Sequence, residues 1–394
     1  MSVLVAFFVH MIYIGSNFYP KFYTLLPSSF LLGLVTGPLW TSQIMFISAS
    51  ATRISQKREK LFLHTLNRHN SIFFSINGLA FAIGSIVSSV IFRNDINIVD
   101  NNLTKPCGVY QCDAVQVMPQ ASIFNNSTTF QSSSISRPSV DTIYQLYAVY
   151  LAFDVIGVLI VALFLPPLPM SDWIQKKSGL KSTYSMISLL GDVKMLLILP
   201  YIIAVGIQRF FLFAEFSKAY ITCPYGVGVV GFVMASYAVT NTIITQLIPN
   251  IMKHLNSLIM VAIATAINII CMTFWMFWNP MADQLPLLFV SAVLWGIADS
   301  IFKIDIYGTL PILFSDKKEP AFANLHFWRG IVWTIFFVTA SYICIFTKLV
   351  ICLSFLTFSV VLYGVLRFKV GQERKQAEIK ISVVENEALQ IENT

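Results

Sequence analysis

Charge is scarce in this sequence. Asp, Glu, Lys and Arg together make up 11% of the 394 residues, whereas soluble domains carry about 25%. Hydrophobic residues reach 56% and gather in blocks of about 18–25 residues, the length that crosses roughly 30 Å of hydrocarbon. This composition excludes an ordinary soluble domain. It predicts an all-α membrane protein with several transmembrane helices, for which the lipid bilayer is the first partner.

The sequence also lacks the patterns of catalytic and metal sites. Its six cysteines are scattered, without a CxxC pair or a Cys/His cluster, so no metal site is indicated. The glycines of Gly226–Gly231 open an apolar run and follow no strand, which argues against a nucleotide loop. No Ser/His/Asp or Cys/His arrangement stands at a catalytic spacing. We therefore expect no enzyme activity, no cofactor and no metal.

The formal net charge of +7 indicates topology rather than a nucleic-acid partner. The basic residues lie in short loops between apolar blocks, and most of them fall in one alternating set of loops. The positive-inside rule places that set, together with both termini, in the cytoplasm.

The apolar blocks predict ten spans, four before and six after a connection rich in proline and lysine. Met1–Tyr19 has neither a basic leader nor a small-residue cleavage site, so we interpret it as a span rather than a signal peptide. The predicted spans are Ser2–Tyr19, Phe22–Ala49, Ile72–Phe92, Tyr144–Phe164, Met195–Phe213, Gly226–Leu247, Leu255–Phe277, Leu285–Leu313, Phe322–Phe346 and Leu349–Phe368.

Four segments follow from this division. Residues 1–164 form an N-terminal half of four helices, and residues 165–194 form a cytoplasmic linker. Residues 195–368 form a C-terminal half of six helices. Residues 369–394 are polar and of mixed charge, and we expect a disordered cytoplasmic tail with room for one short helix.

The long loop 93–141 falls on the exterior side. It carries glycosylation acceptor patterns at Asn102, Asn125 and Asn126, which are modified only outside the cytoplasm. The same loop holds Cys107 and Cys112. In an oxidising compartment these two could close a small disulfide, and the alternative is two free thiols.

Charged residues inside the eighth span are candidates for a polar interior. Asp299 and Lys303 are four apart, a spacing that brings two side chains together on one helix face. They are either an ion-coupling pair that lines a cavity or a structural pair that neutralises itself. Asp305 lies nearer the cytoplasmic side and is either part of this interior or wetted. Arg329, in the next span, either completes the network or extends to the headgroups.

Three further charges lie in or near other spans. Arg209 and Glu215 flank Phe210–Phe213, and because they are six apart they do not share a helix face, so we expect no pair between them. Asp154 lies about ten residues into its predicted span without a nearby cation. A carboxylate in a membrane is a functional candidate, and the alternative is a protonated or hydrogen-bonded structural residue.

Two short turns suggest an internal repeat. Lys57-Arg-Glu-Lys-Leu-Phe62 follows a Leu-Leu-Gly span, and Lys317-Lys-Glu-Pro-Ala-Phe322 follows a Leu-Trp-Gly span. Either the similarity is chance, or the chain has two related halves as in the major facilitator superfamily. In the second case the second and eighth spans here match the fourth and tenth of a twelve-span plan, so that two spans are missing from the front and the N-terminal half is incomplete.

Several stretches resemble the unc-93 family, and within it the homolog A branch. They are Phe22–Gln43, Glu215–Cys223 with Gly231–Met234, and the most specific of them, Leu294–Ser300 followed by Glu319–Asn324 and Trp328.

The resemblance implies a major-facilitator helical bundle without an established transport substrate. It further implies a role as an ion-channel regulator, notably of potassium channels, or as a trafficking partner of other membrane proteins. It also suggests that Glu215, Tyr220 and Cys223 form an extracellular mouth. We therefore expect a plasma-membrane regulator. The alternatives are a solute or ion transporter that uses Asp299, Lys303 and Arg329, and an inactive fragment.

Overall fold

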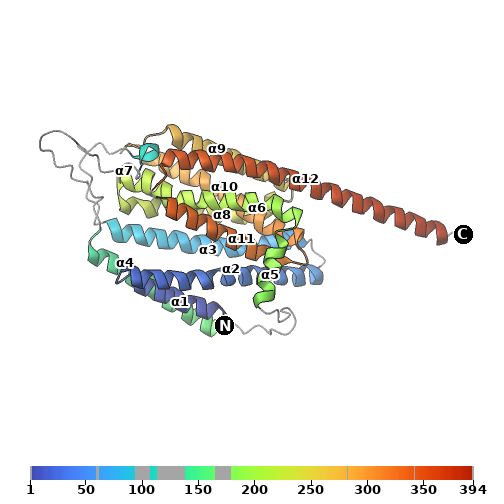
Figure 1. The fold of residues 1–394 in the computed structure, drawn as a ribbon, viewed down its shortest axis with the longest axis horizontal. Helices are drawn as coiled ribbons and strands as arrows, with labels where there is room; N and C mark the ends of the chain where they lie inside the picture. Colours follow the sequence, from blue (N-terminus) through green and yellow to red (C-terminus); the bar gives the residue numbers. More distant parts are fainter. Residues whose placement is uncertain are drawn as a thin grey trace.

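The computed structural model describes residues 2–58, 62–93, 107–112, 138–164, 179–281, 283–340 and 342–392. Within these ranges the secondary structure is helical and contains no strand. The long helices lie side by side in one elongated bundle, with the short helix α5 across one end of it and α12 projecting beyond it (Figure 1).

Four helices precede residue 165. They are α1 (Ser2–Ser16), α2 (Phe22–Arg58), α3 (Phe62–Phe92) and α4 (Val140–Phe164). Helix α1 packs against α2 and α4, and α2 packs against α3. A short 3-10 helix, η2 (Gly108–Tyr110), belongs to the long loop between α3 and α4.

The remaining elements follow residue 178. They are α5 (Gly179–Leu189), α6 (Val193–Phe210), the π-helix η4 (Phe211–Thr222), α7 (Cys223–Tyr225), α8 (Val227–Ile251), α9 (Ser257–Phe277), α10 (Leu285–Leu313), α11 (Lys318–Thr339) and α12 (Ile345–Glu392).

Length and composition confirm an all-α, multi-pass membrane protein. In the part of the chain that the structure describes, nine helices are long and apolar enough to cross a bilayer. The one predicted span that is not among these nine is Ser2–Tyr19. It corresponds to α1, which has 15 residues and therefore measures about 22 Å at 1.5 Å per residue. It is shorter than the other nine because the helix ends at Ser16, before the predicted end at Tyr19.

Local signals set several helix ends. The side chain of Asp192 accepts a hydrogen bond from the backbone N–H of Lys194 at 2.8 Å and caps α6. Asn256 caps α9 in the same way, because a short polar side chain satisfies an N–H that has no partner inside the helix. Gly226 separates α7 from α8 with φ +83°, a conformation that glycine adopts without steric cost.

The C-terminal tail differs from the prediction. Helix α12 continues to Glu392, whereas we expected disorder from residue 369 onward. The residues after Phe368 include many Glu, Lys, Gln and Ala, which favour helix, and a helix that is already formed can extend without a new nucleation step. The predicted linker contains α5, and its residues 165–178 lie outside the described ranges.

The two groups of helices meet mainly where α3 packs against α8. Gly231 makes this approach close, because a Cβ at that position would collide with the carbonyl oxygen of Ser85. Ser89 accepts a hydrogen bond from the N–H of Phe232 at 3.0 Å, and Ser75 donates one to the carbonyl oxygen of Thr242 at 3.0 Å. Small and hydroxyl side chains at helix contacts are the usual means of association in a membrane.

Candidate functional site

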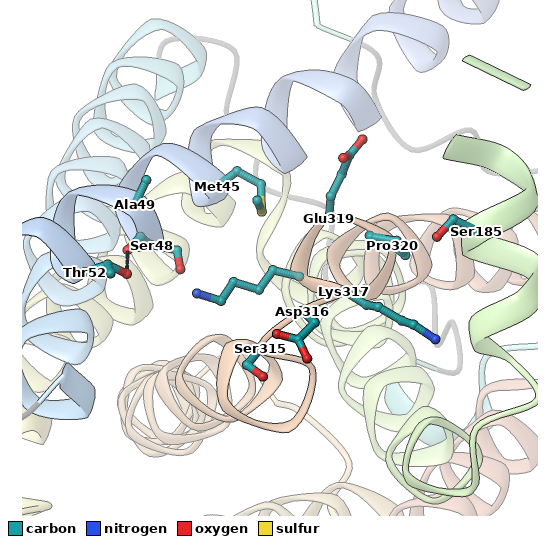
Figure 2. Close-up of a pocket in the computed structure, with 11 residues that line it drawn as sticks. Met45, Ser48, Ala49, Thr52, Ser185, Ser315, Asp316, Lys317, Glu319 and Pro320 are labelled. Atoms are coloured by element: carbon teal, nitrogen blue, oxygen red, sulfur yellow. Dashed lines mark hydrogen bonds between the residues drawn. The ribbon is translucent and has the colours of Figure 1, made fainter. Parts of the chain in front are cut away.

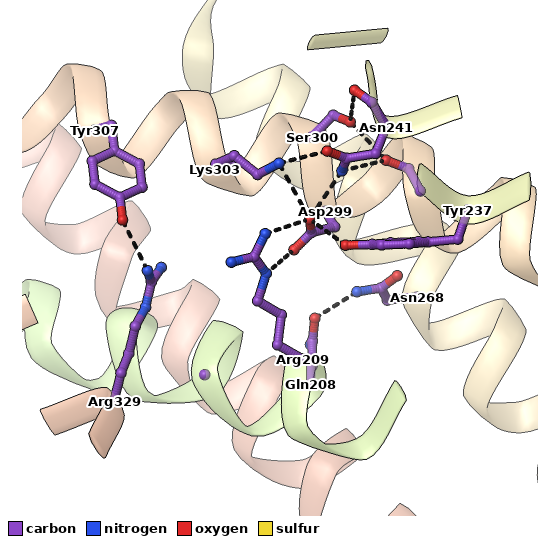
Figure 3. Close-up of polar contacts among 12 residues, drawn as sticks. Gln208, Arg209, Tyr237, Asn241, Asn268, Asp299, Ser300, Lys303, Tyr307 and Arg329 are labelled. Carbon is purple, nitrogen blue, oxygen red and sulfur yellow. Dashed lines mark hydrogen bonds and ion pairs between the residues drawn. The ribbon is translucent and has the colours of Figure 1, made fainter. Parts of the chain in front are cut away.

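Helix α10 is buried along most of its second half, and that half carries the charges found in the sequence. Asp299 is 4% exposed and Lys303 is 6% exposed. Both face a polar cluster formed with side chains of α6 and α8, shown in Figure 3. We call this the Asp299 cluster; its members are Arg209, Tyr237, Asn241, Asp299, Ser300 and Lys303.

Arg209 is the main partner of Asp299. Its Nε donates to Oδ1 at 2.9 Å and its Nη2 donates to Oδ2 at 3.0 Å. This two-bond arrangement matches the planar guanidinium to the planar carboxylate, which gives both strength and a fixed orientation. Arg209 stands in the last turn of α6, directly before the π-helix η4, and therefore ties α6 to α10.

Helix α8 completes the coordination of Asp299. The hydroxyl of Tyr237 donates to Oδ2 at 2.8 Å, and the amide of Asn241 donates to the same oxygen at 2.9 Å. The Nζ of Lys303 lies 3.8 Å from Oδ2 and also donates to the side-chain oxygen of Asn241. The ammonium lies 5.5 Å from the ring centroid of Phe74 on α3, so the cluster also contacts the N-terminal helices.

The spacing of Asp299 and Lys303 places both side chains in one cluster, as the helix period indicates. What sequence reasoning missed is the pairing of Asp299 with Arg209, which is 90 residues away in the sequence. Sequence separation carries no signal for that pairing. The only hint was that Arg209 stands at membrane depth, where an ionisable side chain usually has a partner.

A second buried ion pair joins η4 to α12. Lys348 donates to Glu215 at 2.6 Å and to the carbonyl oxygen of Ala340 at 2.9 Å. The side chains are 2% and 5% exposed. Arg209 and Glu215, which flank the same aromatic run, thus have separate partners on α10 and α12.

The cysteine pairing predicted for the exterior loop is wrong. Cys107 is bonded to Cys223 at the start of α7, and Cys112 is bonded to Cys344 just before α12. The partners are 116 and 232 residues apart, and cysteine spacing does not define such connectivity. The N–H of Ile345 also donates to the carbonyl oxygen of Gln111 at 3.4 Å. Segment 107–112, which we call the strap, is therefore fixed at both ends to the C-terminal helices.

The remaining charged candidates lie outside the Asp299 cluster. Asp305 is 3% exposed and accepts hydrogen bonds from Tyr201 and Ser257, so the wetted interpretation is wrong; the hydroxyls on α6 and α9 replace water. Arg329 donates to the hydroxyl of Tyr307 at 3.2 Å.

Asp154 has a partner on α1, because its Oδ2 lies 2.7 Å from Nδ1 of His10. The acceptor residues Asn102, Asn125 and Asn126 lie outside the described ranges.

The Asp299 cluster connects α6, α8 and α10 through hydrogen bonds and ion pairs. Arg209 and Lys303 supply two formal positive charges and Asp299 supplies one negative charge. Beside them, Asn268 of α9 donates to the side-chain oxygen of Gln208 at 2.5 Å. Among the residues that the structure describes, no group of three or more His, Cys, Asp or Glu could hold a metal ion.

The comparisons with known proteins all point to the same family. The family model for the ion channel regulatory protein UNC-93 matches residues 1–363. The chain is 30% identical over 368 residues to protein unc-93 homolog A of Danio rerio, covering 92% of this chain and 76% of that protein. It is 27% identical over 384 residues to the Xenopus laevis homolog A, covering 95% and 81%. A Caenorhabditis elegans relative, named "Putative potassium channel regulatory protein unc-93", is 24% identical over 377 residues, covering 93% and 51%.

Proposed function

The chain belongs to the UNC-93 family, and on this premise we propose that it is a non-enzymatic membrane protein that regulates or accompanies an ion channel. Potassium channels are the first candidates for the partner, because the name of the Caenorhabditis elegans relative specifies that channel class. The protein would act through lateral contacts between helices and through its exterior loop.

The observation that carries this proposal is the full coordination of Asp299. A transporter of the major-facilitator type works by rocking one half against the other around a central site, and a carboxylate that couples ions has to exchange its partners in that cycle. Asp299 instead receives two hydrogen bonds from Arg209 and one each from Tyr237 and Asn241. Removing one partner from such a buried network costs about 3–5 kcal/mol. This favours a fixed joint over a moving one.

The strap supports the same conclusion. It belongs to the loop between α3 and α4, yet both of its cysteines are bonded to elements that follow residue 222. Two covalent links therefore join the loop of the N-terminal half to the C-terminal half. A bundle linked in this way suits a protein that presents a constant surface to a partner.

We also propose the plasma membrane as the location, with both termini in the cytoplasm. The distribution of basic residues supports this orientation. The loop that carries Asn102, Asn125 and Asn126 then lies outside, and the two disulfides of the strap suit an oxidising compartment.

The test is co-expression with a panel of potassium channels. Each channel is expressed alone, with the chain, or with the variant Arg209→Met, which opens the Asp299 cluster. Whole-cell current and channel surface biotinylation are recorded together. We expect at least one channel to change its current or its surface level with the chain but not with the variant. Lys253→Met, a change at an exposed residue in the turn after α8, serves as the matched control. Unchanged currents and surface levels across the panel would contradict the proposal.

A transporter is the second candidate, and one observation favours it. The side chain of Arg209 is 27% exposed, and the Nε of Arg329 has no hydrogen-bond partner within the described ranges. Together with Lys303 these groups could attract an anionic solute. Reconstituted vesicles decide between the two: uptake without any channel, abolished by Asp299→Asn and by Lys303→Met, would establish transport. Absence of uptake in vesicles, with altered channel current in cells, would leave the regulator.

A further inference from the structure

A cavity of about 280 Å³ lies apart from the Asp299 cluster, at the end of the bundle where α2 ends and α11 begins. The last third of α2, helix α5 and the turn between α10 and α11 enclose it (Figure 2). We call it the turn cavity. Its volume is below the range of about 300–1,000 Å³ that holds drug-sized ligands, so it suits a small polar group.

The side chains that line the turn cavity carry charges of both signs. Lys317 and Lys318 are cationic, and Asp316 and Glu319 are anionic. Hydroxyl groups of Ser48, Thr52, Ser185 and Ser315 complete the polar lining. Because the lining contains two positive and two negative side chains, it is formally neutral. A simple anion would meet carboxylates as well as ammonium groups, whereas a zwitterion would find a partner for each of its ends.

Ser48 offers a hydroxyl that a ligand in this space could bind. Ser48 is 1% exposed, and its hydroxyl has no hydrogen-bond partner within the described ranges. Figure 2 shows that hydroxyl directed into the cavity. Leaving a buried hydroxyl unpaired costs free energy, so a group that hydrogen-bonds to it would be stabilising. The second α2 hydroxyl that lines the cavity, that of Thr52, already donates to the carbonyl oxygen of Ser48 at 3.0 Å.

The start of α11 adds a second favourable feature. This helix has 22 residues and begins at Lys318, so its first N–H groups lack partners inside the helix. The N-terminus of a helix carries a partial positive charge and binds phosphate groups readily. A phosphate in the turn cavity would therefore meet the lysines, the helix start and the hydroxyl of Ser48.

The sequence of α2 indicates that the cavity lies near the headgroup layer. Arg53 and Lys57 follow Ser48 within three turns of α2, which marks the exit of that helix from the apolar layer. Helix α5 lies across the bundle (Figure 1) and exposes Tyr184 at 73% and Ile187 at 57%. A short helix that exposes apolar side chains beside polar ones is typical of a helix lying in the membrane interface.

We propose that the turn cavity binds the headgroup of a phospholipid that carries a phosphate and a primary ammonium but no carboxylate, namely phosphatidylethanolamine. The phosphate accepts hydrogen bonds from a lysine ammonium of the turn and from the hydroxyl of Ser48. The primary ammonium donates hydrogen bonds to Asp316. Phosphatidylcholine has the same phosphate, but its quaternary ammonium has no N–H to donate, so it binds more weakly.

The test uses the full chain, purified in detergent, freed of lipid and titrated with phosphatidylethanolamine or phosphatidylcholine under native mass spectrometry. We expect phosphatidylethanolamine to bind about tenfold more tightly, as the loss of a charge-assisted hydrogen bond implies. The double variant Lys317→Ala/Lys318→Ala and the variant Ser48→Ala should lose this preference. Lys253→Ala and Ser42→Ala are the matched controls, because both residues are exposed and lie outside the cavity lining.

Two further measurements distinguish loss of lipid binding from misfolding, and lipid binding from binding of free phosphate. In lipid-free protein, Ser48→Ala should leave the melting temperature unchanged or raised, because it removes an unpaired hydroxyl; added phosphatidylethanolamine should then stabilise it less than the unaltered chain. Inorganic phosphate at equal concentration should not displace the lipid. Equal affinity for the two lipids, retained preference in the cavity variants, or displacement by inorganic phosphate would each overturn the proposal.

Discussion

The helices before residue 165 and those after residue 192 bury their side chains to different extents. In the most apolar stretches of α2, α3 and α4, 11%, 28% and 6% of residues are buried. The value is 61% for Val193–Tyr225, 56% for α10 and 28% for α11. The C-terminal helices thus carry a packed protein core. The N-terminal helices direct most of their apolar side chains outward, to lipid or to a partner.

The buried ion pairs follow the same division. Arg209 with Asp299 and Glu215 with Lys348 both join elements of the C-terminal group. The N-terminal group has one described pair between its own helices, that of His10 with Asp154, in which the histidine side chain is 45% exposed. The comparison teaches that buried charge in this protein accompanies close packing. A buried charge needs a partner, and the buried charged side chains among the described residues, Glu215, Asp299, Lys303, Asp305 and Lys348, all lie in the C-terminal group.

The largest expected effect is a loss of stability from a substitution in the C-terminal group. Arg209→Met leaves the carboxylate of Asp299 buried without its main partner, which should lower the free energy of unfolding by about 3–5 kcal/mol. Thermal unfolding in detergent measures the change. Adding Asp299→Asn to this variant should restore part of the loss, because the neutral amide is cheaper to bury. A shift no greater than that of Lys253→Met would show that the Asp299 cluster does not support the fold.

An effect of intermediate size concerns the connection between the groups. With a protease site inserted between residues 165 and 178, the strap should hold the two fragments together on a denaturing, non-reducing gel. Replacing both Cys223 and Cys344 by serine should separate them, and each lost disulfide should cost about 2–4 kcal/mol of stability. Replacing the free cysteines Cys271 and Cys352 is the control. Fragments that separate without any substitution would favour a bond between Cys107 and Cys112 instead.

The smallest expected effect lies in the N-terminal group. His10→Ala removes the contact with Asp154, which joins α1 to α4. Side-chain hydrogen bonds between membrane helices contribute about 0.6 kcal/mol on average, so the melting temperature should fall only slightly, and far less than for Arg209→Met. A loss as large as that of Arg209→Met would mean that the two groups depend on buried polar contacts equally, and the comparison would fail.

Much of the fold was predictable because the bilayer sets a length for every span. Apolar blocks long enough to cross it marked the helices in the sequence, and nine of them are long enough in the described ranges. The end of α12 was not predictable in this way. No apolar pattern extends beyond Phe368, and the continuation to Glu392 depends on helix propensity and on the helix that precedes it.

The candidate site was predictable only where its partners share a helix. Asp299 and Lys303 are four residues apart, and the helix period places them on one face. Tyr237 and Asn241 have the same spacing on α8, but two polar side chains in an apolar span give no indication of the carboxylate that they contact. Ser48 likewise has no distinguishing neighbour in the sequence. It becomes informative only when its burial and its unpaired hydroxyl are known.

The sequence by itself determined the class of the protein, the approximate positions of its long apolar segments and the family resemblance. These properties depend on composition and on patterns within a few helical turns. The tertiary structure alone decided which charges pair and which cysteines join. Arg209 and Asp299 are 90 residues apart, Glu215 and Lys348 are 133 apart, and the disulfides span 116 and 232 residues. Such contacts arise from the way in which helices pack, and the spacing of residues along a chain does not record that packing.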